Sequence, residues 1–291
     1  MPNTIDLLSR LTDCTELTLD GSTVLAAIHP TIPGMGTLSA PQGGWSSIEA
    51  GEEWLKSRGC DRVVGPMEGC SWFAYRANLG PFERKAFAME PVAEADPWLL
   101  SGYRTLATYT STLQPHESAL DRLNHHHHRA QELGVRFRSI DLDRVEEELE
   151  RCHALTHASF SSAVGYAPIP SGLFVAMYAP LLRSAPADLL LLAESEDEQV
   201  LGYCLTFPEP LAPERKEVVV KSLAVHPASQ GASVGSALVA EAHQRALSMG
   251  FVSGGIHALM RGDSNSQHIT ARGGAEVIRN YALYEKNLKA S

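Results

Sequence analysis

The chain has 291 residues, of which 44% are hydrophobic, enough for the cores of about two domains. A formal net charge of −10 excludes a general nucleic-acid binder, because such a protein presents a basic face. No apolar run approaches the ~20 residues of a membrane span, and the N-terminus lacks a basic region followed by an apolar one, so we expect neither a membrane partner nor a signal peptide. Five scattered cysteines favour reduced thiols and a cytoplasmic location.

The first part of the chain, residues 1–114, is predicted to be a separate unit of short strands and helices. Apolar stretches bounded by turn residues predict the strands, and apolar positions at helical spacing predict the helices. In chain order we expect strands at 17–19 and 24–28, a loop holding Pro30, Pro33, Gly34 and Gly36, a helix over 48–58 ended by Gly59, a strand at 62–64, a short helix at 98–102 and a strand at 106–112.

Aromatic and cationic residues gather in the stretch 65–76 after the strand at 62–64. Trp72, Tyr75 and Arg76 lie within five residues of each other there. Two interpretations are open. The rings pack between the two parts of the chain, or they form a wall of a substrate pocket.

Residues 115–132 are predicted to form a helical connector that contains four consecutive histidines, His125 to His128. Since only positions three or four apart share a helix face, just His125 and His128 align. No third ligand is evident nearby. We therefore expect a solvated helix face and no metal site.

The second part, residues 133–291, alternates strands and helices more regularly. We expect a strand at 135–140, a helix over 145–160, a loop leading into a short helix over 166–178, a hairpin of strands at 188–193 and 200–207, a strand at 218–225, a helix ended by Gly250, a strand at 256–260, a short helix opening with Asn265 and Ser266, and a last strand at 277–287. Asp263 and Ser264 are both able to cap the short helix, and Gly273 and Gly274 follow its end.

A strand, a small-residue loop and a helix follow one another between residues 218 and 250. The loop, Gln230 to Gly235, is rich in small residues that let the backbone approach an anion closely. Free backbone N–H groups converge at the start of the helix, where the positive end of the helix dipole also lies. This arrangement predicts a phosphate-binding site.

The same stretch resembles the GNAT superfamily of N-acetyltransferases. That family carries Gln/Arg-x-x-Gly-x-Gly/Ala after a strand of the type Leu-Ala-Val-x-Pro. The chain has Leu223-Ala224-Val225-His226-Pro227 followed by Gln230-Gly231-Ala232-Ser233-Val234-Gly235. Ser233 departs from the pattern by replacing the first motif glycine, at a cost on the order of 1 kcal/mol if the position needs positive φ.

The resemblance covers about residues 133–289 and implies an α/β fold with a mixed, mostly antiparallel sheet flanked by helices. The order of elements in residues 1–114 echoes it, so we expect a tandem fold whose first copy is degenerate. The counterpart of the phosphate loop there, Ala40 to Gly44, lacks the motif spacing, and Pro41 removes one amide donor. We expect no cofactor in that copy.

In the family, this region binds acetyl-coenzyme A (acetyl-CoA). The pyrophosphate lies on the loop amides, the pantetheine arm lies along main-chain groups of the strand exposed where it splays from its neighbour, and an asparagine opening the next helix bonds the arm. Carried over by position, these cofactor residues are Leu223, Ala224, Val225, Gln230, Gly231, Ala232, Ser233, Val234, Gly235, Ser236 and Asn265.

The implied reaction is direct acetyl transfer to an amine, which needs a proton donor and a base. Many relatives place a tyrosine seven residues after the asparagine, but here Arg272 occupies that position and cannot serve as an acid. Tyr281 and Tyr284 are the candidate acids, with ordinary packing as the alternative. Glu217 is the candidate base, with a solvated strand end as the alternative.

The acceptor is predicted to be a small-molecule amine or a peptide amine. Acidic walls would suit polyamines or amine drugs, whereas apolar walls such as Phe174, Met177 and Tyr178 would suit amino acids or aromatic amines. Trp72, Tyr75 and Phe174 are the candidate substrate contacts. The rival hypothesis is a catalytically idle module that binds acyl-CoA or acts through its first part. The oligomeric state stays open, a homodimer included.

Overall fold

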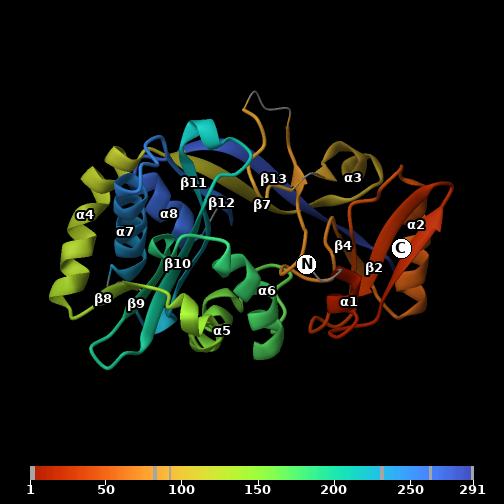
Figure 1. Ribbon diagram of the computed structural model, residues 1–291. Helices are drawn as coiled ribbons and strands as arrows, with labels where there is room; N and C mark the ends of the chain where they lie inside the picture. Colours follow the sequence, from red (N-terminus) through yellow and green to blue (C-terminus); the bar gives the residue numbers. More distant parts are fainter. Residues whose placement is uncertain (1–3, 81–83, 92, 230–232, 262–263, 290–291) are drawn as a thin grey trace.

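The structure, a computed structural model, describes residues 4–80, 84–91, 93–229, 233–261 and 264–289. The strands of these residues join into one 13-stranded sheet with helices on both faces (Figure 1). Most neighbouring strands pair antiparallel, and a minority pair parallel. The expected mixed α/β fold is confirmed.

The first half of the chain contains three short strands and one helix that the sequence did not predict. Its elements are α1 (Thr4–Leu8), β1 (Cys14–Leu19), β2 (Ser22–Ile28), β3 (Met35–Leu38), α2 (Ser46–Ser57), β4 (Arg62–Gly65), β5 (Ala77–Asn78), β6 (Ala93–Glu94), α3 (Asp96–Leu100) and β7 (Arg104–Gln114). The expected loop around Gly36 is wrong, because this residue lies in β3. A Cβ atom there would lie 2.5 Å from Leu55 Cδ2, so the glycine serves close packing rather than a turn.

The second half follows the predicted order closely. Its elements are α4 (His116–Glu132), β8 (Arg136–Ser139), α5 (Val145–Phe160), α6 (Ser171–Arg183), β9 (Leu190–Glu194), β10 (Val200–Pro208), β11 (Glu217–Val225), α7 (Val234–Ser248), β12 (Gly254–Arg261), α8 (Asn265–Arg272) and β13 (Glu276–Asn287). The helix expected to be short, α6, has 13 residues and continues through Pro180.

The two halves exchange strands. The strand order is β1-β2-β3-β4-β13-β7-β12-β11-β10-β9-β8, so β7 of the first half lies between β12 and β13 of the second. In turn, the C-terminal strand β13 pairs with β4 of the first half. Figure 1 shows these long strands crossing the centre of the molecule. We still propose domain boundaries at residues 114 and 133 along the chain. In the folded structure, however, strands of both units pair with each other in one sheet.

The order of elements repeats along the chain. Strands β1, β2 and β3, helix α2, strand β4, helix α3 and strand β7 correspond in order to β9, β10, β11, α7, β12, α8 and β13. In both halves the strand before the long helix pairs parallel with the strand after it, as β3 with β4 and β11 with β12. This repetition supports the expected tandem arrangement.

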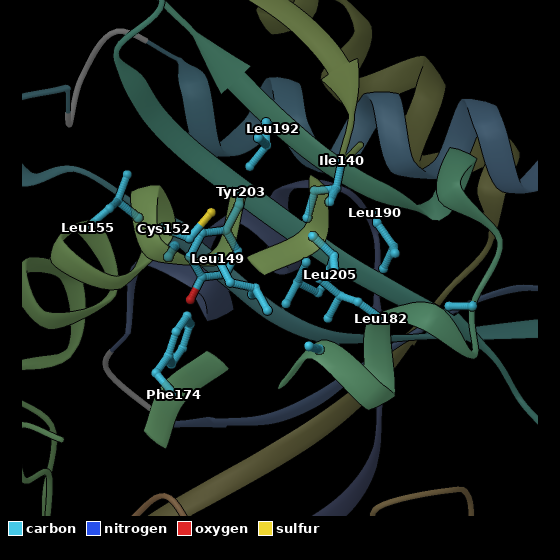
Figure 2. Packing of buried hydrophobic residues seen from close by; sticks show 14 of the residues in the cluster. Ile140, Leu149, Cys152, Leu155, Phe174, Leu182, Leu190, Leu192, Tyr203 and Leu205 are labelled. Atoms are coloured by element: carbon cyan, nitrogen blue, oxygen red, sulfur yellow. The ribbon is translucent and has the colours of Figure 1, made fainter. Parts of the chain in front are cut away.

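Helices α5 and α6 cover one face of β9 and β10, with Figure 2 showing the core between them. Leu149 and Cys152 of α5 and Phe174 of α6 pack against Tyr203 and Leu205 of β10. Each large apolar side chain buried in this way contributes about 1.5–3 kcal/mol. Helix α7 lies on the opposite face of the sheet, with α4 and α8 beside it (Figure 1).

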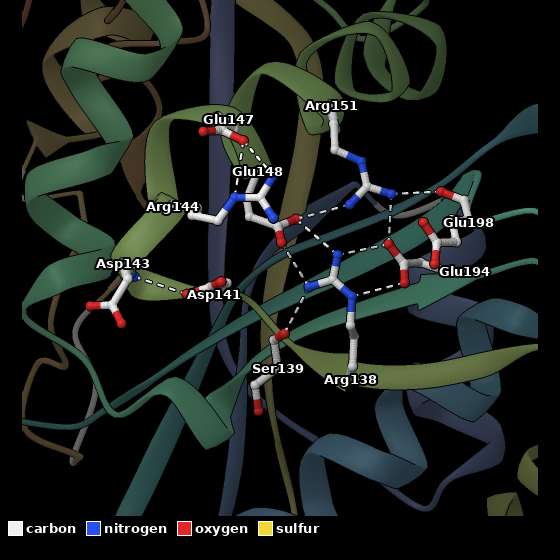
Figure 3. Close-up of polar contacts among 10 residues, drawn as sticks. All are labelled: Arg138, Ser139, Asp141, Asp143, Arg144, Glu147, Glu148, Arg151, Glu194 and Glu198. Carbon is white, nitrogen blue, oxygen red and sulfur yellow. Dashed lines mark hydrogen bonds and ion pairs between the residues drawn. The ribbon is translucent and has the colours of Figure 1, made fainter.

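An ion-pair network ties α5 to strands β8 and β9 (Figure 3). Arg138 donates to both Glu148 and Glu194, and Arg151 pairs with the same two carboxylates. Both glutamates are largely buried, at 8% and 6% side-chain exposure, so the network is less screened than a surface pair. It holds the start of α5 over the sheet edge.

Candidate active site

β11 and β12 form a fork. They pair in parallel from Glu217 and Gly254, but the pairing ends at Val220 and His257. β11 continues to Val225 and β12 to Arg261. The edge of β11 that faces the fork therefore has no strand partner beyond Val220 in the described part of the chain. This geometry is the splay that the sequence resemblance implied.

A β-bulge in β11 lies at the fork. Leu205 of β10 pairs with Ser222, whereas the next residue, Thr206, pairs with Val220. Lys221 is thus the extra residue, and it has no opposite neighbour on β10. Residues 221–223 are half-buried rather than fully buried, so the strand is reachable at the fork.

The far end of β11 is held by its neighbours on both sides. Ser159 of α5 donates its hydroxyl to the Val225 carbonyl at 2.9 Å. Gly202 of β10 lies so close that a Cβ atom would be 2.8 Å from the Ala224 carbonyl oxygen. A side chain at Gly202 would therefore push β10 away from the expected cofactor strand. Both contacts fix the course of β11 past the fork.

Ser233 stands at the N-terminus of α7 in the left-handed conformation, with φ of 64°. The expectation that this position needs positive φ is confirmed, and an L residue there carries strain. Its hydroxyl makes no capping bond to the helix. Gln230, Gly231 and Ala232 of the predicted phosphate loop lie outside the described residues.

The Ser233 hydroxyl instead meets the histidine run of α4. His126 Nδ1 lies 3.0 Å from Ser233 Oγ. Desolvation and the nearby charges of His125, Arg272 and Arg129 lower the pKa of His126. Although the chain is acidic overall, two arginines, Arg129 and Arg272, therefore lie near the start of α7, where they would suit an anionic ligand.

The four histidines do not share one solvated face. His125 and His128 are exposed as expected, whereas His127 stacks on Phe137 at 4.8 Å and pairs with Glu241 at 3.0 Å. The solvated-face prediction is thus wrong for His127 and for His126. No group of three or more side chains suited to metal binding is found among the residues that the structure describes.

The first turn of α7 packs tightly against the fork. Val234, Gly235 and Ser236 are buried. A Cβ atom on Gly235 would lie 3.0 Å from Ile269 Cδ1 of α8 and 3.3 Å from Val225 Cγ2. The small residue is needed here for helix packing, so any charge placed at this position would first disturb the fold.

Helix α8 begins as predicted. Ser264 is its N-cap and accepts from the Gln267 amide at 3.3 Å. Asn265, the expected contact of the pantetheine arm, is the first helical residue and is exposed. Asp263, the other candidate cap, lies outside the described residues. Arg272, which takes the place of the family tyrosine, is exposed at the end of α8.

The three residues predicted from the sequence as acid or base, Glu217, Tyr281 and Tyr284, are all buried and contact other parts of the protein. Glu217 has 4% exposure and pairs with Arg84, so the alternative of a solvated strand end is wrong. Tyr281 donates to Glu90 at 3.1 Å, and burial raises its pKa. Tyr284 lies in the core of the first half and pairs with Gly65 of β4, so β7 and β12 separate its strand from β11.

The predicted substrate contacts pack between the two halves. Trp72 donates its indole N–H to the Ala167 carbonyl at 2.7 Å and meets Phe174 edge-on at a centroid distance of 5.8 Å. Tyr75 lies beneath the Arg76 guanidinium, 3.8 Å from the ring centroid. This geometry matches the packing interpretation of the aromatic stretch.

A pair that the sequence did not single out stands at the fork. Lys221 Nζ donates to the Tyr178 hydroxyl at 3.3 Å, and it lies 4.9 Å from the centroid of the same ring. Tyr178 of α6 is stacked on Phe174 at 4.7 Å and meets Trp72 edge-on at 6.3 Å. The sequence offered one signal for this pair, a lysine in the middle of an apolar strand. Its contact with α6 is visible only in the structure, where Lys221 is the extra residue of the bulge.

In the first-half loop at 40–44, the Gln42 backbone amide is not available to bind a phosphate group. The Gln42 amide is bonded to the Thr23 carbonyl, and the Thr23 amide to the Gln42 carbonyl. A Cβ atom on Gly43 would lie 2.2 Å from the Gly21 carbonyl oxygen. The loop folds back onto β2, which supports the expectation that this copy holds no cofactor.

One sequence comparison finds a family that matches part of the second half. The model of the acetyltransferase (GNAT) family matches residues 145–262, which run from α5 to the end of β12. No curated protein matches the chain.

Solved structures show the fold over nearly the whole chain. A GCN5-related N-acetyltransferase from Sphaerobacter thermophilus is 14% identical, with a TM-score of 0.55 over 94% of this chain and 83% of that one. A tandem GNAT protein from the clavulanic acid biosynthesis pathway is 11% identical, with a TM-score of 0.54 over 97% and 85%. The glucosamine N-acetyltransferase region of a fungal multi-domain β-N-acetylglucosaminidase is 14% identical, with a TM-score of 0.55 over 97% and 34%.

Two further observations concern the setting of the site. Among the helices that the structure describes, none is long and apolar enough to span a bilayer. All five cysteine thiols are free, and four of them are buried. The matched segment contains the fork, the bulge and the start of α7. Residues 145–262 of the chain thus match the GNAT family of acetyltransferases.

Proposed function

We propose that the chain transfers an acetyl group from acetyl-CoA to a primary amine by direct attack of the amine. The fork between β11 and β12 is the observation that carries this proposal. It leaves main-chain groups of β11 without strand partners shortly before the start of α7, near which Arg129 and Arg272 lie. An extended arm that ends in a pyrophosphate needs both features.

The residues present fit such a ligand. Main-chain groups of residues 223–225 would hold the pantetheine arm, and amides of residues 230–236 would hold the pyrophosphate, with Asn265 beside the arm. Acetyl-CoA, when bound, supplies a thioester whose carbonyl carbon accepts the amine. A main-chain amide on the unpaired edge of β11 would stabilise the oxygen charge that develops there.

Tyr178 is the proton donor that we assign to the departing sulfur. Its hydroxyl borders the fork, and the Lys221 ammonium beside it stabilises the phenolate left after donation. The phenolate would then take the proton that the acetylated nitrogen loses, which returns Tyr178 to its starting form. Tyr281 and Tyr284 are no longer needed for this role. Glu217 is paired with Arg84 and serves the packing of residues 84–91 on the sheet.

The direct test is release of the coenzyme A thiol from acetyl-CoA with the full chain and a panel of amines. The proposal expects release that depends on both acetyl-CoA and an amine. Acetyl-CoA binding without release from any amine would favour the rival, an idle acyl-CoA module. We further propose a cytoplasmic setting, which the five free thiols support. Small-molecule and peptide amines both remain candidate acceptors, and a homodimer remains open.

A further inference from the structure

One face of helix α4 carries positive charge. Arg122, His126 and Arg129 follow one another at spacings of four and three residues, so they share a face of the helix. The acidic residues of α4 lie on another face by the same rule, and they are Glu117, Asp121 and Glu132. The charges of this helix are therefore sorted by face, although the chain as a whole carries a net charge of −10.

The cationic face of α4 contacts the start of α7 and the end of α8. His126 Nδ1 lies 3.0 Å from the hydroxyl oxygen of Ser233, the N-cap of α7. One turn earlier, Arg122 approaches the turn that follows α8, because a Cβ atom on Gly274 would lie 3.3 Å from Arg122 Nε. Figure 1 shows α4 running beside both helices. Cations of α4 thus border the place where α7 begins.

Two further guanidinium groups lie close to the same histidine. Desolvation, and then the charges of His125, Arg272 and Arg129, lower the pKa of His126, so both arginines are near enough to act on this ring. Arg272 ends α8, whereas Arg129 is on the last turns of α4. Arg122, Arg129 and Arg272 form what we call the arginine cluster, which two helices supply beside the start of α7.

The arginine cluster lacks counter-charges of its own. All three side chains are exposed, and none forms an ion pair with a carboxylate in the part of the chain that the structure describes. The carboxylate of Glu241 on α7 is already paired with Arg245 at 2.7 Å and with His127 at 3.0 Å. Guanidinium groups bind phosphate through paired hydrogen bonds, so a cluster left uncompensated in an acidic protein favours a phosphate ligand.

Coenzyme A carries phosphate at two positions of one ribose, a pyrophosphate on the 5′ carbon and a single phosphate on the 3′ carbon. If the pyrophosphate lies at the start of α7, the 3′-phosphate must lie within the width of that ribose. The contact of His126 with Ser233 places the arginine cluster at this distance from the start of α7, on the side of α4 and α8.

We infer that Arg122, Arg129 and Arg272 bind the 3′-phosphate of coenzyme A and make the chain select coenzyme A over its 3′-dephospho form. The inference rests on the proposed function, because it adds a contact to the same cofactor. All three arginines lie outside residues 145–262, the stretch that the family model matches. This recognition would therefore come from the helices that flank the matched segment.

Calorimetric titration of the full chain with coenzyme A and with 3′-dephospho-coenzyme A tests the inference. The two ligands differ only in the phosphate that the arginine cluster would bind. We expect coenzyme A to bind about tenfold more tightly or better, since several exposed charge pairs add together. The preference should shrink as salt is added, because exposed charges are screened.

Arg129→Met and Arg272→Met should each reduce this preference by about threefold, because methionine keeps an apolar stem without the charge. Arg10→Met is the matched control. Arg10 is also exposed and forms no ion pair with a described carboxylate, but it follows α1 on the other side of the molecule from α4 (Figure 1), so this variant should keep the preference.

Equal affinities of the parent chain for the two ligands would overturn the inference, and so would the parent preference in both the Arg129→Met and the Arg272→Met variants. Either result would leave coenzyme A bound at the fork. A folded chain that binds neither ligand would instead refute the proposed function.

Discussion

Tyr109 of β7 lies directly opposite Tyr281 of β13 in the antiparallel ladder, and the same Tyr109 lies opposite Arg261 of β12 on its other side. A strand from the first half is therefore built into the middle of the second half. The GNAT segment cannot complete its own sheet without it.

A fragment of residues 115–291 should therefore fail to fold. It lacks β7, so β12 and β13 would each expose an unpaired edge in the centre of the sheet. Circular dichroism during urea unfolding should show no cooperative transition for the fragment. Co-expression with residues 1–114 restores β7 and should recover it. A cooperatively folded fragment that binds coenzyme A would contradict the exchange of strands.

The left-handed backbone at Ser233 predicts a difference between two substitutions. Ser233→Gly and Ser233→Ala both remove the contact with His126, but only glycine adopts φ of 64° without strain. We expect the glycine variant to be more stable than the alanine variant by about 1 kcal/mol in urea unfolding. Equal stabilities would mean that the backbone at this position is not held in the left-handed region.

The pair at the fork predicts a loss in the chemical step. Tyr178→Phe should lower kcat by about 10²-fold or more while leaving coenzyme A affinity unchanged. Since an acid must be protonated to donate, the variant should also lose the alkaline limb of the kcat–pH profile. Tyr203→Phe is the control, because that hydroxyl is fully buried and bonded to Thr156 at 3.0 Å. Parent kcat in the Tyr178 variant would exclude the assigned role.

Three buried histidines predict a loss of stability in acid. His116 and His243 meet at 2.8 Å between ring nitrogens, and His243 and His257 meet at 3.3 Å. Burial lowers the pKa of His116 to about 4 and that of His257 to about 3. Between pH ~6.5 and ~4 the unfolded chain binds protons that the folded chain does not, so stability falls as pH decreases through this window.

Urea unfolding at pH 7 and at pH 5 measures this effect. The free energy of unfolding should decrease by more than about 1.4 kcal/mol, the value of one pKa unit. His243→Gln should flatten the decrease, whereas His226→Gln, on an exposed loop, should keep the parent slope. A parent chain with equal stability at both pH values would show that the three rings are not held neutral by the fold.

Local signals in the sequence predicted most elements but not their exchange. Apolar spacing and glycine stops placed α2, α5 and α7. The strand–loop–helix pattern predicted a helix after the loop Gln230 to Gly235, whereas α7 begins at Val234, inside that stretch. Strand order depends on partners far apart in the chain, so nothing local indicated that Tyr109 would face Tyr281. The loop predicted around Gly36 was wrong for a related reason. This glycine is needed because the side chain of Leu55, distant in sequence, packs against it.

The candidate site was predictable where it depends on backbone and not where it depends on side chains from other elements. The fork was implied by the family resemblance, and the strain at Ser233 was stated on the condition that this position needs positive φ. The Lys221–Tyr178 pair depends on a bulge in β11 and on the placement of α6. Glu217 does begin β11, but the alternative of a solvated position was wrong because its partner Arg84 is remote in sequence.

The central claim is that one coenzyme A binds at the fork and the start of α7, and calorimetry tests it most directly. Titration of the full chain should give one site per chain. Ser233→Asp places a carboxylate beside the start of α7 and should weaken binding by about tenfold or more, ~1.4 kcal/mol, while Ser233→Asn, of the same shape and also tolerant of the left-handed conformation, should bind nearly as the parent. A folded chain that binds no coenzyme A, two sites per chain, or equal affinities of the Asp and Asn variants would contradict it.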